Sequence, residues 1–173
     1  MSDVVAQIEQ LWGGLDILVN NAGINTGGGR VVLHEYSPET WEKILRVDLD
    51  GVYHTSRAAI PVMLRGGGGR IINISSVAGL APLRLQSAFV AAKAGVINLT
   101  RSMALEYGPQ NILVNAVAPG STLTRGTEAL FYGPNGAYTD KAASLIAHIP
   151  LGRPGQPEEI AAAVLFLAAP EAS

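Results

Sequence analysis

Three short apolar runs alternate along the chain with longer segments of helical periodicity, and this alternation limits the possible folds more than any other feature. The runs are LDILVN at 15–20, RIINIS at 70–75 and ILVNAVAP at 112–119. Continuous apolar runs bounded by turn residues are typical of strands buried on both faces of a parallel sheet. Because parallel neighbours require a crossover between them, the sequence predicts an α/β fold with right-handed strand–helix–strand units.

The segments around these runs predict the helices. Apolar residues recur at helical spacing over 2–12, 38–65, 86–108 and 158–168. Ser37, Pro38 and Glu39 give the second helix a capping serine, a proline at its first position and an acid in its first turn. Pro61 is expected to kink that helix near its end.

Length, composition and charge indicate one domain over 1–173 and exclude several partners. The 173 residues are 48% hydrophobic with a net charge of −2, and no two Lys or Arg residues are adjacent, so we expect no nucleic-acid partner. No apolar run reaches the roughly 18 residues of a membrane span, so we expect no membrane association. The amino terminus carries acids where a secretory signal carries basic residues. We therefore expect a cytoplasmic protein.

The residue types available limit the chemistry. Without cysteine, the chain has neither a disulfide framework nor a thiolate metal site, and redox chemistry would need a bound cofactor. The histidines His34, His54 and His148 are too scattered for a local metal-ligand spacing. We expect them at the surface and predict no metal site.

Two glycine clusters and one long segment connect the elements. A phosphate-binding loop leaves a strand and opens directly into a helix. The run at 66–69 leaves a helix and enters a strand, which indicates a connector, and the run at 27–29 ends several residues before the next helix. Residues 121–155 combine short helical pieces with three aromatic residues, a pattern typical of a substrate lid at the strand ends.

Several motifs are expected at one end of the sheet, beyond the carboxyl ends of the strands. They are NNAG at 20–23, VDLDG at 47–51, ISSVAG at 74–79, Lys93, NAVAPG at 115–120 and PLGRPGQPEEIA at 150–161. In order and spacing they resemble the short-chain dehydrogenase/reductase family over essentially the whole chain. The resemblance implies a Rossmann-like three-layer fold, here a partial version with about three central strands and flanking helices.

The resemblance also implies roles for individual residues. Ser76 would donate a hydrogen bond to a substrate carbonyl, and Lys93 would bind the nicotinamide ribose and lower the pKa of a nearby tyrosine. Further contacts to NAD or NADP would come from the ends of two strands. These residues are Asn21, Ala22 and Gly23 at the adenosine half, and Pro119, Gly120, Thr122 and Thr124 at the nicotinamide.

Position 89 departs from the family's pattern. The family has its catalytic tyrosine thirteen residues after the serine and four before the lysine, and this chain has Phe89 there. Hydride arriving at a carbonyl carbon leaves an alkoxide that needs a proton, and a phenyl ring has none to give. Residues four apart share a helix face, so we expect Phe89 beside Lys93 and in apolar packing.

The tyrosines of the chain are poor substitutes for the missing phenol. Tyr36, Tyr53 and Tyr107 are expected on other faces or elements, whereas Tyr132 and Tyr138 on the lid could swing toward the site.

Asp48 is a second departure, because the family usually has an asparagine there that anchors a water in a proton relay. An aspartate can accept from that water but adds a negative charge. Two interpretations stay open at this point: a relay position, or a capping or structural acid.

The chain also lacks parts that the resemblance leads us to expect. It begins after the glycine-rich unit that binds the pyrophosphate, and it ends before a final strand. We therefore expect weak or no binding of NAD or NADP by this chain alone, and bare apolar edges on both sides of the sheet.

Three functional hypotheses follow. The first is an NAD(P)-dependent oxidoreductase that interconverts a small-molecule alcohol with a ketone or aldehyde and is impaired in this form. The second is a pseudoenzyme that serves as an oligomerisation or ligand-sensing scaffold. The third is a non-functional fragment. The helices at 38–65 and 86–108 match those that pair subunits in the family, which predicts a homo-oligomer, either a dimer or a tetramer.

Overall fold

The computed structural model describes residues 2–25 and 30–172. The strands and helices alternate as predicted, and most bounds fall within a residue or two of the expected ones. The strands are β1 (Ile17–Asn20), β2 (Gly69–Ile74) and β3 (Ile112–Val117). The longer helices are α1 (Ser2–Trp12), α2 (Pro38–Leu45), α3 (Gly51–Arg65), α4 (Ser87–Tyr107) and α7 (Pro157–Ala168). The glycine run at 27–29 lies outside the described residues.

The three strands form one parallel sheet in the order β1-β2-β3. Ile71 lies opposite Leu18 on one side and Val114 on the other. Consecutive residues of a strand point to opposite faces, and Ile71 and Ile72 are only 0% and 1% exposed. The central strand is therefore covered on both faces, as its continuous apolar pattern predicts.

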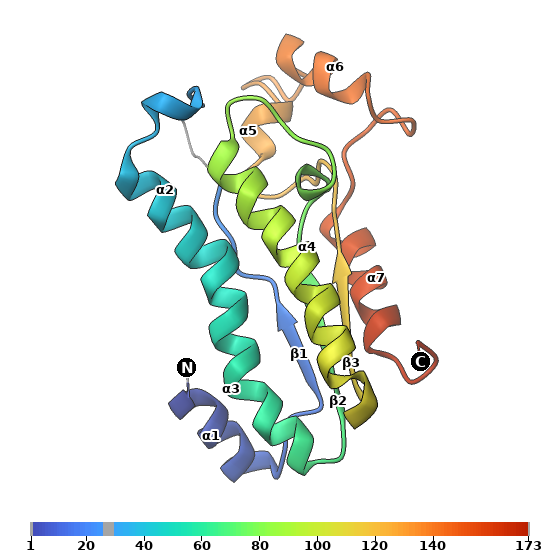
Figure 1. The fold of residues 1–173 in the computed structure, drawn as a ribbon. Helices are drawn as coiled ribbons and strands as arrows, with labels where there is room; N and C mark the ends of the chain where they lie inside the picture. Colours follow the sequence, from blue (N-terminus) through green and yellow to red (C-terminus); the bar gives the residue numbers. More distant parts are fainter. Residues whose placement is uncertain (1, 26–29, 173) are drawn as a thin grey trace.

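Helices cover the two faces of the sheet unequally. On one face α3 and α4 lie across the strands (Figure 1), and Met63 and Met103 pack there against Ile71, Ile112 and Val114. On the other side α7 contacts β2 and β3. The arrangement is a partial Rossmann-like α/β fold, as the sequence predicts.

The helix predicted over 38–65 is not continuous. It consists of α2, a π-helical segment η2 (Arg46–Asp50) and α3. The widened turn falls well before Pro61, where the sequence analysis expected a kink, and α3 continues past that proline to Arg65. Such π-bulges are frequent at functional sites, and this one carries Asp48, which is 0% exposed.

The edges of the sheet are formed by β1 and β3. Ile17 and Val19 on β1 are 45% and 41% exposed, so apolar side chains of this edge strand face solvent. An open apolar edge of this kind favours pairing with another chain. Within the residues that the structure describes, no helix is both long and apolar enough to cross a bilayer.

The segment at 121–155 closes on itself at its base. The amide of Leu123 donates to the carbonyl of Gly155 at 2.8 Å, and the amide of Gly155 donates to the carbonyl of Ser121 at 2.9 Å. Between these ends lie α5 (Glu128–Phe131) and α6 (Asp140–Ile146). Figure 1 shows both at the end of the molecule toward which the strands run.

Candidate active site at the carboxyl ends of the strands

The site is built around Lys93, which α4 carries into the region just beyond the strands. Its side chain is only 7% exposed. Its Nζ lies 3.1 Å from Oδ2 of Asp48 on η2 and donates to the carbonyl of Ile74, the last residue of β2, at 3.2 Å. A charged group this deeply buried requires such partners, because desolvation alone would be costly.

Asp48 also binds the loop that follows β1. Its Oδ1 accepts a hydrogen bond of 2.7 Å from the amide of Ile24. Oδ2 lies at ion-pair distance from Lys93, but among the residues that the structure describes no hydrogen-bond donor is aligned with it. A Cβ added to Gly23 would lie 3.2 Å from Nζ of Lys93 and 3.3 Å from Oδ2 of Asp48. The glycine therefore lets the loop backbone approach the ion pair closely.

The backbone of Lys93 is held as firmly as its side chain. Ser75 donates from its hydroxyl to the Lys93 carbonyl at 2.8 Å. A Cβ on Gly79, which ends the turn η3 (Val77–Gly79), would lie 2.7 Å from the same carbonyl. Sequence analysis did not single out Ser75, although it precedes Ser76 at the end of a strand, where polar side chains gather.

Phe89 lies beside Lys93, as the spacing of four residues predicts. The ammonium nitrogen is 5.7 Å from the centre of the ring, within the range of a cation–π contact. The ring is half-buried and packs against an apolar cluster that includes Ile44, Ala88 and Ala92. Phe89 thus has the apolar packing that we expected, and its ring also contacts the buried charge.

Tyr36 lies closer to Phe89 than the sequence analysis expected. It lies on another element, as expected, but the loop before α2 packs it against the same apolar cluster as Phe89. Its hydroxyl donates to the carbonyl of Leu85 at 3.5 Å, a long hydrogen bond. Leu85 has a φ of 63°, an uncommon conformation for a residue other than glycine.

Ser76 joins the ends of β2 and β3. Its hydroxyl accepts from the amide of Ala78 at 3.1 Å and donates to the carbonyl of Pro119 at 3.5 Å. The amide of Val77 donates to the same carbonyl at 3.0 Å. The half-buried serine therefore caps its own turn and makes only a long hydrogen bond to Pro119.

The remaining predicted cofactor residues lie on the loops after β1 and β3. Asn21, Ala22 and Gly120 are exposed. Thr122 donates from its hydroxyl to the carbonyl of Gly120 at 3.3 Å, and the hydroxyls of Thr124 and Thr127 lie 3.1 Å apart. These residues share the strand-end side with Lys93.

A buried polar network that the sequence analysis missed lies below the site. The Asn20 amide donates to Oδ1 of Asn73 at 2.8 Å and to the hydroxyl of Ser56 at 3.2 Å, and the Asn73 amide donates to the hydroxyl of Thr100 at 2.8 Å. The network runs from α3 through β1 and β2 to α4. Its signal in the sequence is an asparagine at the end of the first apolar run and another within the second.

Tyr132 and Tyr138, in the segment at 121–155, contact each other. The rings of Tyr132 and Tyr138 stack with their centres 5.0 Å apart. A hydrogen bond to Tyr138 raises the pKa of the Tyr132 hydroxyl, which makes it a weaker proton donor. This arrangement favours packing within the segment at 121–155 over replacement of the missing phenol.

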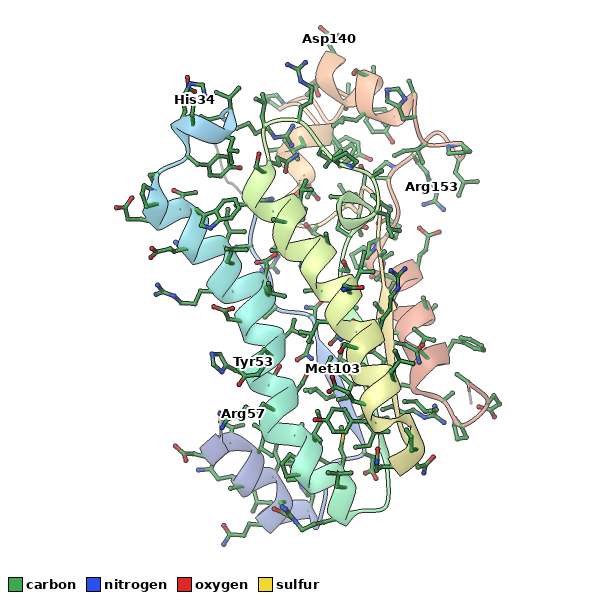
Figure 2. All side chains as sticks on the ribbon, viewed as in Figure 1. His34, Tyr53, Arg57, Met103, Asp140 and Arg153 are labelled. Carbon is green, nitrogen blue, oxygen red and sulfur yellow. The ribbon has the colours of Figure 1, made fainter. Side chains whose placement is uncertain are left out.

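The histidines are at the surface, as predicted. His34 projects from η1 (Leu33–Glu35) at the margin of the molecule (Figure 2), and its side chain is 83% exposed. His54 and His148 are also exposed. In the part of the chain that the structure describes, no three His, Asp or Glu side chains gather closely enough to hold a metal ion.

The chain is similar to known proteins over its whole length. A family model described as enoyl-(acyl carrier protein) reductase matches residues 1–173. The chain is 40% identical to a 3-oxoacyl-(acyl-carrier-protein) reductase of Thermotoga maritima, over 100% of the chain and 66% of that protein.

Two further relatives act on other substrates. The chain is 42% identical to a 3alpha-hydroxysteroid dehydrogenase of Mediterraneibacter gnavus, over 98% of the chain and 64% of that protein. It is 41% identical to a trans-4-hydroxycyclohexanecarboxylate dehydrogenase of Sinomonas cyclohexanicum, over 98% of the chain and 59% of that protein. The chain thus spans less than two thirds of the length of each relative.

Proposed function

The chain belongs to the short-chain dehydrogenase/reductase family. We propose that it functions as an NAD(P)-dependent oxidoreductase that interconverts an alcohol and a ketone or aldehyde, and that its proton-transfer step is impaired. The observation that carries this proposal is the pair formed by Lys93 and Phe89 on α4. The lysine is buried at the strand ends, and the residue 5.7 Å away has no proton to give.

The backbone around Gly23 supports a nucleotide site at the strand ends. Gly23 carries no side chain where the loop meets Lys93, and the carboxyl ends of parallel strands are the usual site for dinucleotides. The residues that would hold NAD or NADP are Asn21, Ala22, Gly23, Lys93, Pro119, Gly120, Thr122 and Thr124. When bound, the cofactor supplies or accepts the hydride.

The chain's own residues would orient the substrate. Ser76 exchanges its long bond to Pro119 for a hydrogen bond to the substrate oxygen. In the reductive direction that oxygen gains negative charge, and a donor already in place stabilises it without reorganisation. Residues 121–155, with the stacked Tyr132 and Tyr138, would cover the bound substrate as a lid.

The relatives support a substrate with a carbon-bound hydroxyl or oxo group. Their names cover an oxoacyl thioester carrier, a hydroxysteroid and a hydroxycyclohexane acid. Because these molecules differ in size and charge, we propose only the reacting group and not one particular substrate.

The proposal is tested by comparing the parent chain with Phe89→Tyr. Titration calorimetry with NADH and NADPH should give the same weak, saturable binding for both, because the change affects only the proton donor. Reduction of a 3-oxo ester should be about 10²- to 10⁴-fold faster with Phe89→Tyr, the usual contribution of a general acid. Equal turnover in the two proteins would overturn the proposal.

The absence of a proton donor at Phe89 also favours a second candidate function. In this function the chain is a scaffold without turnover, and copies of it assemble through α2, α3 and α4. Tyr53 and Leu64 on α3 are 48% and 43% exposed, and Leu105 on α4 is 83% exposed, which supports a surface for a second copy. Figure 2 shows Tyr53 and Arg57 on α3. A stable dimer or tetramer in sedimentation equilibrium, with no turnover even in Phe89→Tyr, would favour this function over the first.

A further inference from the structure

The Lys93 ammonium is engaged on several sides by groups of the protein itself. Its partners are the Asp48 carboxylate at 3.1 Å, the Ile74 carbonyl at 3.2 Å and the face of the Phe89 ring at 5.7 Å. An ammonium has three N–H donors. One of them donates to Ile74, and the nearby carboxylate offsets the charge, so little net charge is left to act on another group.

The carboxylate of Asp48 is oriented toward the Lys93 ammonium by a backbone hydrogen bond. The amide of Ile24 fixes one carboxylate oxygen at 2.7 Å, and this leaves the other oxygen against Nζ. Both side chains are almost completely buried, so water does not screen their attraction. The carboxylate therefore neutralises the ammonium locally.

We infer that Asp48 neutralises Lys93 in this chain, so that the lysine cannot lower the pKa of an acid at position 89 until the ion pair is broken. Asp48 is then a positioning residue that acts through Lys93, and it is a second determinant of the impaired chemistry besides Phe89. The inference rests on the proposed function for the meaning of position 89, but its test needs no turnover.

The physical basis is the charge that a group at position 89 meets. A lone ammonium lowers the pKa of a nearby acid by about 1–3 pH units. A carboxylate 3.1 Å from that ammonium cancels most of this effect. Among the described residues, Lys93 on the same helix and Tyr36 from the loop before α2 are the titratable groups next to Phe89, and Asp48 on η2 contacts Lys93.

The experiment introduces a phenol as a reporter and titrates it by ultraviolet difference absorbance against the parent chain, which cancels the five native tyrosines. The variants are Phe89→Tyr, Phe89→Tyr with Asp48→Asn, and Phe89→Tyr with Asp50→Asn. The side-chain amide that Asp48→Asn introduces keeps an oxygen to accept from the Ile24 backbone amide. Asp50 is the matched control, because it is an exposed aspartate at the end of the same π-helical segment.

We expect the phenol in Phe89→Tyr to titrate near the ordinary value of about 10. Adding Asp48→Asn should lower its pKa by about 1–3 pH units, and adding Asp50→Asn should leave it unchanged. Equal pKa values with and without Asp48 would overturn the inference.

A second measurement keeps the inference testable if Asp48→Asn does not fold, as judged by circular dichroism. In Phe89→Tyr alone, a phenol pKa about 2 pH units or more below the ordinary value would show that Lys93 already acts freely, and would overturn the inference. A shift on adding Asp48→Asn without any gain of carbonyl reduction would support the inference while contradicting the proposed function.

Discussion

Lys93 and Asp48 form an ion pair at a place where neither charge is solvated by water. The exposed fractions of their side chains are 7% and 0%. Arg46 on η2 and Glu42 on α2 form an ion pair of 3.8 Å whose side chains are 73% and 65% exposed. The two pairs contain the same kinds of charge, so burial alone should separate their contributions to stability.

We predict that Lys93→Met lowers the free energy of unfolding by about 3–5 kcal/mol, because it leaves the Asp48 carboxylate buried and unpaired. Arg46→Met, the control, should cost less than about 1 kcal/mol, since water screens the surface pair. Urea denaturation followed by circular dichroism measures both. Similar losses for the two variants would show that the buried pair contributes no more than a surface one.

At the scale of elements, the contact between η3 and the α4 backbone positions Lys93. A Cβ on Gly79 would lie 2.7 Å from the carbonyl carbon and oxygen of Lys93 and 2.9 Å from the amide nitrogen of Ala94. These are backbone atoms, so they cannot rotate away. Gly14, in the loop after α1, has no heavy atom within 4 Å of an added Cβ.

Gly79→Ala should therefore push α4 away from the turn and cost about 1–3 kcal/mol, as overpacking does. Gly14→Ala should stay within about 0.5 kcal/mol of the parent. The midpoint of thermal unfolding reports both changes. A melting temperature for Gly79→Ala as high as that of Gly14→Ala would mean that the turn moves without cost.

The start of α7 gives a prediction about pH. Glu159 accepts two hydrogen bonds of 2.8 Å from Arg153 and one of 2.7 Å from the Gln156 amide. The Arg153 hydrogen bonds, followed by the Gln156 amide, lower the pKa of Glu159 from 4.5 to about 2. A lowered pKa means that the carboxylate stabilises the folded state fully above its unfolded value and loses this effect as the pH falls.

Glu159→Gln should consequently lower the melting temperature at neutral pH. The difference from the parent should shrink as the pH falls from about 4.5 toward about 2. Glu158→Gln removes the same charge from the same helical turn and serves as the control. A difference between Glu159→Gln and the parent that does not change over this range would exclude the ionised carboxylate as its source.

At the scale of the whole molecule, the buried asparagines connect the helices on one face to two strands. Asn73 Oδ1 accepts a hydrogen bond of 2.8 Å from the Asn20 side-chain amide, and the Asn73 amide donates one of 2.8 Å to the Thr100 hydroxyl. The Thr100 hydroxyl in turn donates a hydrogen bond of 2.7 Å to the carbonyl of Val96 on α4. Each of these groups depends on its neighbour, because burial keeps water from replacing a lost partner.

Asn73→Ala should cost about 1–3 kcal/mol, since it leaves Asn20 and Thr100 with unpaired buried groups. Ser102→Ala removes an exposed side-chain bond on α4, between Ser102 and Glu106, and should cost little. Urea denaturation and amide hydrogen exchange of β1 and β2 measure the loss. Unchanged exchange in Asn73→Ala would show that the network does not stabilise the two strands.

The sequence determined the class of fold and the neighbourhood of the site. Apolar runs such as RIINIS can be buried only between helices, so the parallel sheet follows from local pattern. The spacing of four residues places Phe89 beside Lys93 for the same reason, because helix geometry fixes it. The absence of a proton donor at position 89 is likewise a property of the residue type.

Only the tertiary structure decided what those residues contact. The ion pair joins residues far apart in the chain, as does the Asn20–Asn73 contact, so no local pattern could specify them. The π-helical segment that turns Asp48 inward interrupts a helix whose periodicity looks continuous. Tyr36 reaches the Phe89 cluster from the loop before α2, a segment distant in sequence from α4. Side-chain chemistry can be read from the sequence, whereas the partner that neutralises a buried charge depends on how the distant segments pack.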